Sequence, residues 1–238
     1  MKLTDFSTLT FDCYGTLIDW ETGILAGLRP WTERAGADVE EAELLAAFGR
    51  HEDRLEREHP AMPYPELLRA VAVAIGDEFG TPMRDGEADA FAASIADWPA
   101  FADSPEALGY LKKHYRLVVL SNVDTASFAH SNQKLGVAFD AVFTAGDIGS
   151  YKPDPANFNY MLDRLDGMGI AKGDILHTAQ SLFHDIVPAN RLGLATNWIN
   201  RRHGKPGAGA TPPAEAQPDF RHDSLAGFVE AHRAALRG

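Results

Sequence analysis

The sequence of 238 residues has a single cysteine, Cys13, so no disulfide can form within the chain, and no CxxC motif offers a thiolate metal site. It contains no apolar run of about 18 residues for a membrane span and no apolar signal segment near residue 1. Basic residues are scarce, because 22 Lys and Arg stand against 34 Asp and Glu, for a net charge of −12. This charge argues against nucleic acid or an anionic membrane as the main partner. We therefore expect a cytoplasmic protein that acts on a small molecule.

Short apolar runs alternate with helical patterns over most of the chain. The runs are rich in Val, Ile and Leu and lack polar alternation, which is typical of parallel strands buried on both faces. Strands that alternate with helices imply an α/β fold with a doubly wound parallel sheet. The expected strands are 9–12, 117–122, 141–143, 175–179 and 194–199, and the expected helices between and after them are 126–135, 157–165 and 224–236.

The segment from about residue 21 to 97 breaks this rhythm. It is rich in Ala, Leu, Glu and Arg, residues 40–58 and 65–79 have helix-type apolar spacing, and no convincing strand occurs in it. We predict a helical cap domain over residues 20–97, inserted after the first strand and lying over the carboxyl ends of the strands. The catalytic core would then comprise residues 1–19 and 98–238. The segment 204–218 is rich in Gly, Pro and Ala and is expected to be an irregular loop.

Polar side chains stand at the ends of the predicted strands. Taken singly, each could cap a helix, form a turn or, for a lysine, face solvent. In an open parallel sheet, however, the carboxyl ends of the strands meet in one crevice, so we expect these side chains to converge there. A carboxylate at such a strand tip is presented as a nucleophile. The residues are Asp12 and Thr16 after the first strand, Ser121 and Asn122 after the second, Lys152 in Ser-Tyr-Lys-Pro-Asp-Pro, and Asp185 in Gln-Ser-Leu-Phe-His-Asp.

Four segments of the chain resemble the four motifs of the haloacid dehalogenase (HAD) superfamily. They are Asp12-x-Tyr14-Gly15-Thr16-Leu17, Ser121-Asn122, Tyr151-Lys152-Pro153-Asp154 and Asp185. The resemblance extends over nearly the whole chain and is closest to the 2-haloacid dehalogenase (type II) branch. It implies a Rossmann-like core with a helical cap inserted after the first motif.

The residue two positions after Asp12 distinguishes the branches of this superfamily. Phosphatases place a second Asp there as general acid and bind Mg²⁺ between carboxylates, whereas this chain has Tyr14. A departing halide needs no proton, so a dehalogenase can omit both the acid and the metal. The resemblance therefore implies that Asp12 attacks C2 of a short 2-haloalkanoic acid, such as a haloacetate or 2-halopropanoate, with inversion. Water then hydrolyses the aspartyl ester, without cofactor or metal.

The resemblance also implies roles for the other motif residues. Lys152 would keep the Asp12 carboxylate ionised and later stabilise the tetrahedral intermediate of ester hydrolysis. Asp185 would pair with Lys152 and position the hydrolytic water. The residues expected to bind the substrate, line its pocket or orient Asp12 are Tyr14, Thr16, Ser121 and Asn122.

Three positions depart from the family's pattern. The cap arginine that stabilises the departing halide aligns with Gly49, so Arg50 fills that role only after a shift of one residue, which rotates it by about 100° on a helix. The family's Tyr six residues after the motif Lys is Phe158 here, and we place Phe158 among the residues that bind the substrate. An Asn that binds the water is missing before the last Asp, which leaves Ser181 or Gln180 for that role.

Two alternative functions remain open from the sequence. A phosphatase-like hydrolase would hold Mg²⁺ between Asp12 and Asp185 and would depend strictly on that ion. A non-catalytic binding protein of the same fold would explain the altered cap, but it gives no reason to keep both Asp12 and Lys152. His184 is either structural or aids water activation or halide binding. If the chain assembles, we expect a homodimer, because two-fold dimers are the commonest soluble assemblies.

Overall fold

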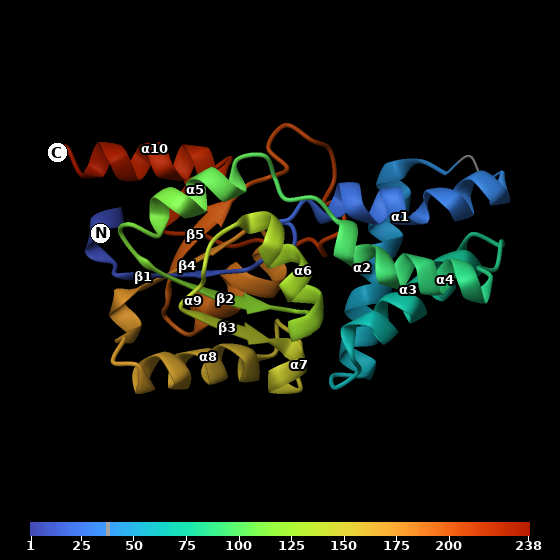
Figure 1. The fold of residues 1–238 in the computed structure, drawn as a ribbon, viewed down its shortest axis with the longest axis horizontal. Helices are drawn as coiled ribbons and strands as arrows, with labels where there is room; N and C mark the ends of the chain where they lie inside the picture. The colour runs from blue at the N-terminus through green and yellow to red at the C-terminus, as the bar shows by residue number, and fades with distance from the viewer. Residues whose placement is uncertain (37–38) are drawn as a thin grey trace.

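The computed structural model describes residues 1–36 and 39–238 and contains a six-stranded sheet with helices on both sides (Figure 1). The strand order is β3-β2-β1-β4-β5-β6, and every neighbouring pair is parallel. The strands are β1 (Thr8–Phe11), β2 (Arg116–Ser121), β3 (Ala141–Thr144), β4 (Ile175–Ala179), β5 (Ala195–Ile199) and β6 (Phe220–His222). This arrangement confirms the expected doubly wound parallel sheet.

Ten α-helices occur in the described residues, together with four shorter helical turns. The α-helices are α1 (Trp20–Ala35), α2 (Glu41–Glu58), α3 (Tyr64–Glu78), α4 (Asp85–Ala93), α5 (Ser104–Leu111), α6 (Thr125–Leu135), α7 (Ala145–Ile148), α8 (Pro155–Gly167), α9 (Val187–Arg191) and α10 (Leu225–Ala235). The turns are η1 (Leu3–Asp5), η2 (Ser94–Asp97), η3 (Lys172–Asp174) and the π-helical η4 (Leu182–Ile186). None of the helices in the described residues is long and apolar enough to cross a membrane.

The inner strand β2 shows why the sheet needs helices on both sides. Its side chains alternate between the two faces, and both faces are apolar. Leu117 and Val119 belong to the cluster that includes α5, α6 and α10, whereas Val118 and Leu120 pack with α8 and α9. A strand of this composition is stable only between two layers of helices.

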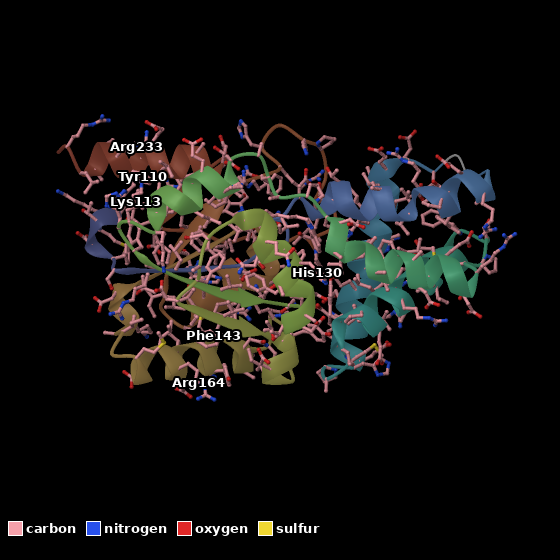
Figure 2. All side chains as sticks on the ribbon, in the orientation of Figure 1. Tyr110, Lys113, His130, Phe143, Arg164 and Arg233 are labelled. Carbon is pink, nitrogen blue, oxygen red and sulfur yellow. The ribbon has the colours of Figure 1, made fainter. Side chains whose placement is uncertain are left out.

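The labelled side chains in Figure 2 mark these two layers. Tyr110 on α5 and Arg233 on α10 lie together on one side of the sheet, with the guanidinium carbon 4.7 Å from the ring centre. Arg164 on α8 lies on the opposite side, near Phe143 of β3. The sheet is therefore enclosed, and the ends of its strands are the places where polar side chains can gather.

The chain leaves the sheet directly after β1 and forms the helical insert, residues 20–97. In its described part the helical insert contains only helices and turns, and Figure 1 shows it beyond the carboxyl ends of the strands. Its interior is apolar and aromatic, with Phe48 in edge-to-face contact with both Trp20 and Phe91. The helical insert thus faces the edge of the sheet at which Asp12 stands.

Several elements escaped the sequence analysis. β6 has three residues and directly follows the Gly- and Pro-rich segment 204–218, so it shows no strand pattern of its own. The sequence analysis did not predict α1 and α4 as separate helices within the Ala- and Glu-rich segment, and it did not predict α5 after that segment. The five strands predicted from apolar runs were found within one residue of their expected bounds.

Candidate active site

Asp12 follows β1, and each of its two carboxylate oxygens accepts a hydrogen bond. Oδ1 accepts a hydrogen bond from Lys152 Nζ at 2.9 Å, and Oδ2 accepts one from Thr16 Oγ1 at 2.6 Å. The Thr16 hydroxyl in turn accepts from the backbone N–H of Gln180 at 2.8 Å. The turn between them requires Gly15, whose φ of 87° lies in the left-handed region. The Asp12 carboxylate is therefore fixed in orientation at the end of the strand.

Lys152 lies between two carboxylates and is only 1% exposed. Besides Asp12, its ammonium donates to Asp185 Oδ1 at 2.7 Å and to the Leu120 carbonyl at 3.0 Å, so all three protons are used. The Asn122 side chain holds the backbone of Lys152 through two hydrogen bonds. Its Oδ1 accepts from Lys152 N at 2.7 Å, and its Nδ2 donates to Lys152 O at 2.9 Å.

Asp185 lies in the π-helical turn η4 and is fully buried. Its Oδ1 also contacts His177 Nε2 at 3.0 Å, and His177 Nδ1 contacts Thr10 Oγ1 at 2.9 Å. The tautomer that satisfies both contacts accepts at Nδ1 and donates from Nε2. Asp185 Oδ2 has no hydrogen-bond partner in the described chain, so one oxygen of this buried carboxylate remains free for a ligand.

The three charged groups shift one another's pKa values. Burial raises the pKa of Asp12 above its usual value, although the Lys152 ammonium and the Thr16 hydroxyl oppose this rise. Burial also disfavours ionised Asp185, but Lys152 and His177 outweigh it and hold the pKa of Asp185 below its usual value. Burial alone would lower the pKa of Lys152, but the two carboxylates outweigh burial and hold this pKa above its usual value. At neutral pH Lys152 is therefore a cation shared by two carboxylates.

A small cavity of ≈ 30 Å³ opens beside this cluster. One water needs about 10–15 Å³ of such space, so the cavity has room for roughly two or three waters. It lies between the end of the sheet and the helical insert. Its lining residues are Asp12, Tyr14, Trp20, Glu52, Glu56, Tyr64, Ser121, Asn122, Val123, Lys152, Ser181, His184, Asp185 and Thr211. No three His, Cys, Asp or Glu side chains in the described residues form a group suited to a metal ion.

Most residues singled out from the sequence line this cavity or contact Asp12. Tyr14 lines it with its ring, because its hydroxyl bonds to Ser131 Oγ at 2.8 Å. The Ser121 hydroxyl is buried without a partner in the described chain. Ser181 lines the cavity and accepts from the backbone N–H of His184 at 2.8 Å, so it also begins the turn that carries Asp185.

Two residues expected to bind the substrate, Arg50 and Phe158, do not line this cavity. Arg50 is on the outer side of α2, where its exposed guanidinium pairs with Glu78. Gly49 is packed against the backbone carbonyl of Ala210, so the segment 204–218 covers the position that aligns with the family's arginine. Phe158 is fully buried within α8 and packs edge-to-face on His177, behind the cavity rather than in it.

Sequence analysis missed two acidic residues of the cavity, Glu52 and Glu56 on α2. They are 3% and 4% exposed. A signal for them existed, because they lie on the same stripe of the helix as the buried Phe48 and Leu55, where apolar residues are expected. Carboxylates in the apolar stripe of an amphipathic helix indicate a polar cavity on that side.

The fold and the cavity define the class of protein: an α/β protein that presents a carboxylate at the tip of a parallel strand, beneath a helical insert. Residues 6–179 match the model of the haloacid dehalogenase-like hydrolase family, and the chain belongs to this family. One curated relative is (S)-2-haloacid dehalogenase 4A of Burkholderia cepacia, 25% identical over 201 residues, which cover 82% of this chain and 84% of that protein. Another is (S)-2-haloacid dehalogenase of Pseudomonas putida, 23% identical over 207 residues, covering 82% and 85% of the two chains.

Solved structures share the fold over nearly the whole chain. L-2-haloacid dehalogenase from Xanthobacter autotrophicus, with chloropropionic acid covalently bound, superimposes with a TM-score of 0.77 at 16% identity, covering 96% of this chain and 98% of that one. A defluorinating L-2-haloacid dehalogenase gives a TM-score of 0.77 at 22% identity, with 98% of each chain covered. A putative HAD-hydrolase of Bacillus subtilis bound to magnesium gives 0.74 at 19% identity, with 94% and 97% covered.

Proposed function

We propose that this hydrolase removes halide from short 2-haloalkanoic acids, such as haloacetates and 2-halopropanoates, through an ester on Asp12. The observation that carries the proposal is the buried Asp12–Lys152–Asp185 cluster beside a small cavity, with Tyr14 rather than a carboxylate two residues after Asp12. The curated relatives, which are named (S)-2-haloacid dehalogenases, support the same reaction.

In the first step an Asp12 oxygen attacks C2 of the substrate, and the carbon–halogen bond breaks. The halide leaves with the bonding electrons, and the product is an ester between the Asp12 carboxyl and C2. Thr16 and Lys152 orient the carboxylate, because each donates to one of its oxygens. Holding the nucleophile in one orientation lowers the entropic part of the barrier.

In the second step water attacks the carboxyl carbon of the Asp12 ester. Asp185 Oδ2 is buried, has no partner in the described chain and belongs to a cavity-lining residue, so it can accept a proton from this water. Lys152 stabilises the negative charge of the tetrahedral intermediate. Collapse of the intermediate restores the Asp12 carboxylate and releases the 2-hydroxy acid and one proton.

The proposed reaction requires no metal ion or general acid for the leaving group. Tyr14 does not replace the phosphatase acid, because its hydroxyl bonds to Ser131 and burial raises the pKa of its phenol well above the usual value. Losing a general acid typically costs 10²–10⁴-fold in rate when the leaving group needs a proton. A halide escapes this cost, whereas the alkoxide of a phosphate ester does not.

The proposal is tested by halide release from chloroacetate, 2-chloropropanoate and fluoroacetate in EDTA, with a phosphate ester tested in parallel with and without Mg²⁺. We expect halide release that the chelator leaves unchanged. In H₂¹⁸O, label should enter the Asp12 carboxylate during turnover. Cleavage of the phosphate ester alone, dependent on Mg²⁺, would instead establish the phosphatase-like function. Binding of the acid without label or halide would establish a binding protein.

A further inference from the structure

The cavity is lined by more carboxyl groups than a binding site for an anionic substrate is expected to have. Four carboxyl groups line it, from Asp12, Asp185, Glu52 and Glu56, and Lys152 is the one cation among the described lining residues. Burial lowers the pKa of His184 to about 4, so this imidazole is neutral at pH 7. If all four carboxyls were ionised, the cavity would carry three more negative than positive charges, and a 2-haloacid anion would be repelled.

Glu52 and Glu56 are the groups that can remain neutral. They stand four residues apart on α2 and therefore face the same side on successive turns. Neither forms an ion pair within hydrogen-bonding distance in the described chain, unlike Asp12 and Asp185, which share Lys152. Two buried carboxylates without a cation cannot both ionise at low cost, so one or both keep a proton.

The hydrogen bonds to these residues fit neutral acids. Glu52 Oε1 accepts from the Tyr64 hydroxyl at 2.7 Å, and Glu56 Oε1 accepts from Asn122 Nδ2 at 3.1 Å. The Asn122 amide cannot turn around, because its other contacts are the backbone N–H and carbonyl of Lys152. Each glutamate thus has one oxygen satisfied as an acceptor, which leaves Oε2 to carry the proton and donate it.

A second polar atom, Nε2 of His184, lies near Glu56 at the cavity. His184 Nε2 is buried without a hydrogen-bond partner in the described residues, although His184 lines the cavity. It lies 4.0 Å from Glu56 Oε2, which is too far for a direct hydrogen bond. Two donors at this separation on one cavity wall can contact the same ligand atom.

We infer that Glu56, kept as a neutral acid by its burial beside Glu52, and Nε2–H of His184 donate the hydrogen bonds that the departing halide needs. This inference rests on the proposed dehalogenation. As the carbon–halogen bond breaks, negative charge develops on the halogen, and both donors stabilise it without transferring a proton. They stand in for an arginine, since Arg50 faces away and Gly49 leaves no side chain at the aligned position.

The proton on the pair makes halide release sensitive to alkaline pH. Burial raises the pKa of Glu52 to about 8, against the hydrogen bond from Tyr64. Burial and the neighbouring Glu52 raise the pKa of Glu56 well above its usual value, although Asn122 and Lys152 oppose this rise. Among these neighbours Asp53 also raises both pKa values. The pKa of Tyr64 is raised well above its usual value, so it does not titrate in the same range. Alkylation of Asp12 should therefore slow at alkaline pH, where the pair loses its protons.

The experiment measures single-turnover alkylation of Asp12 by chloroacetate from pH 6 to 10. Glu56→Gln keeps a neutral donor of nearly the same shape, so it should slow alkylation by less than about tenfold and abolish the alkaline loss. Glu56→Leu removes the donor and should slow alkylation by about 10²–10³-fold, as removal of one oxyanion-hole donor does. Glu58→Gln, on the exposed end of the same helix, should behave as wild type.

Infrared spectroscopy without substrate provides a readout that does not depend on activity. The carbonyl stretch of a protonated acid should be present at pH 7 and missing from the double variant Glu52→Gln, Glu56→Gln. Wild-type alkylation by Glu56→Leu, an alkaline loss retained in Glu56→Gln, or no infrared difference would overturn the inference while leaving Asp12 as nucleophile. Failure of the wild type to release any halide would overturn the proposed function, and the halide contact with it.

Discussion

Replacing Lys152 by Met should destabilise the protein strongly at neutral pH. The substitution removes the cation that Asp12 and Asp185 share at 2.9 and 2.7 Å and leaves two buried carboxylates facing each other. Removing one partner of a buried ion pair typically costs about 3–5 kcal/mol, which is a large part of a domain's stability of about 5–15 kcal/mol. For a chain of this size the loss corresponds to roughly 6–20 °C in Tm.

Urea denaturation of wild type and variant at pH 7 and pH 5 measures this loss. Without the ammonium, the pKa values of both carboxyls rise in the folded protein, so the native state keeps protons that the unfolded chain has released. The free energy of unfolding then falls as pH rises above the unfolded pKa of about 3.9, and it recovers as pH falls. The Lys152→Met deficit should therefore be smaller at pH 5 than at pH 7. Adding Asp185→Asn should restore part of the stability.

Lys112→Met is a matched control. Lys112 also pairs with an aspartate, Asp140 at 2.6 Å, but both side chains are about one-third exposed. Such partly solvated pairs contribute about 0–1 kcal/mol, so this variant should remain close to wild type. If Lys152→Met lost no more stability than Lys112→Met, or lost as much at pH 5 as at pH 7, the shared-cation account of the cluster would be refuted.

Four further substitutions test the other parts of the site. Intact-mass analysis after chloroacetate should show a carboxymethyl adduct in Asp185→Asn, which stalls at the ester, and none in Asp12→Asn; an adduct in the latter would remove Asp12 from the mechanism. Arg50→Ala should change halide release by less than about fivefold, because its ion pair is exposed, and a loss of a hundredfold would return Arg50 to the site. Gly49→Ala should cost about 1–3 kcal/mol in urea denaturation, since its Cβ would collide with the Ala210 carbonyl, and wild-type stability would show that this packing is loose.

The sequence alone was sufficient to predict five of the six strands of the sheet and the convergence of Asp12, Lys152 and Asp185. Apolar runs without alternation, such as the one that forms β2, can be stable only between two layers of helices, so local composition determines the layers. Once the strands are parallel, their carboxyl ends lie at one edge, and the residues that follow them must meet. Asp12, Lys152 and Asp185 converge for this reason although up to 173 positions separate them in the sequence.

The wall of the cavity opposite the sheet was decided only by the tertiary structure. A helix presents a different face with every residue, about 100° apart, so the side of α2 that enters the cavity depends on what its other sides pack against. The contact of Gly49 with Ala210 and the pairing of Arg50 with Glu78 set that rotation, and Glu52 and Glu56 point inward as a result. Gly49 and Ala210 are 161 residues apart in the sequence, and Arg50 and Glu78 lie on different helices, so no pattern within α2 encodes these contacts.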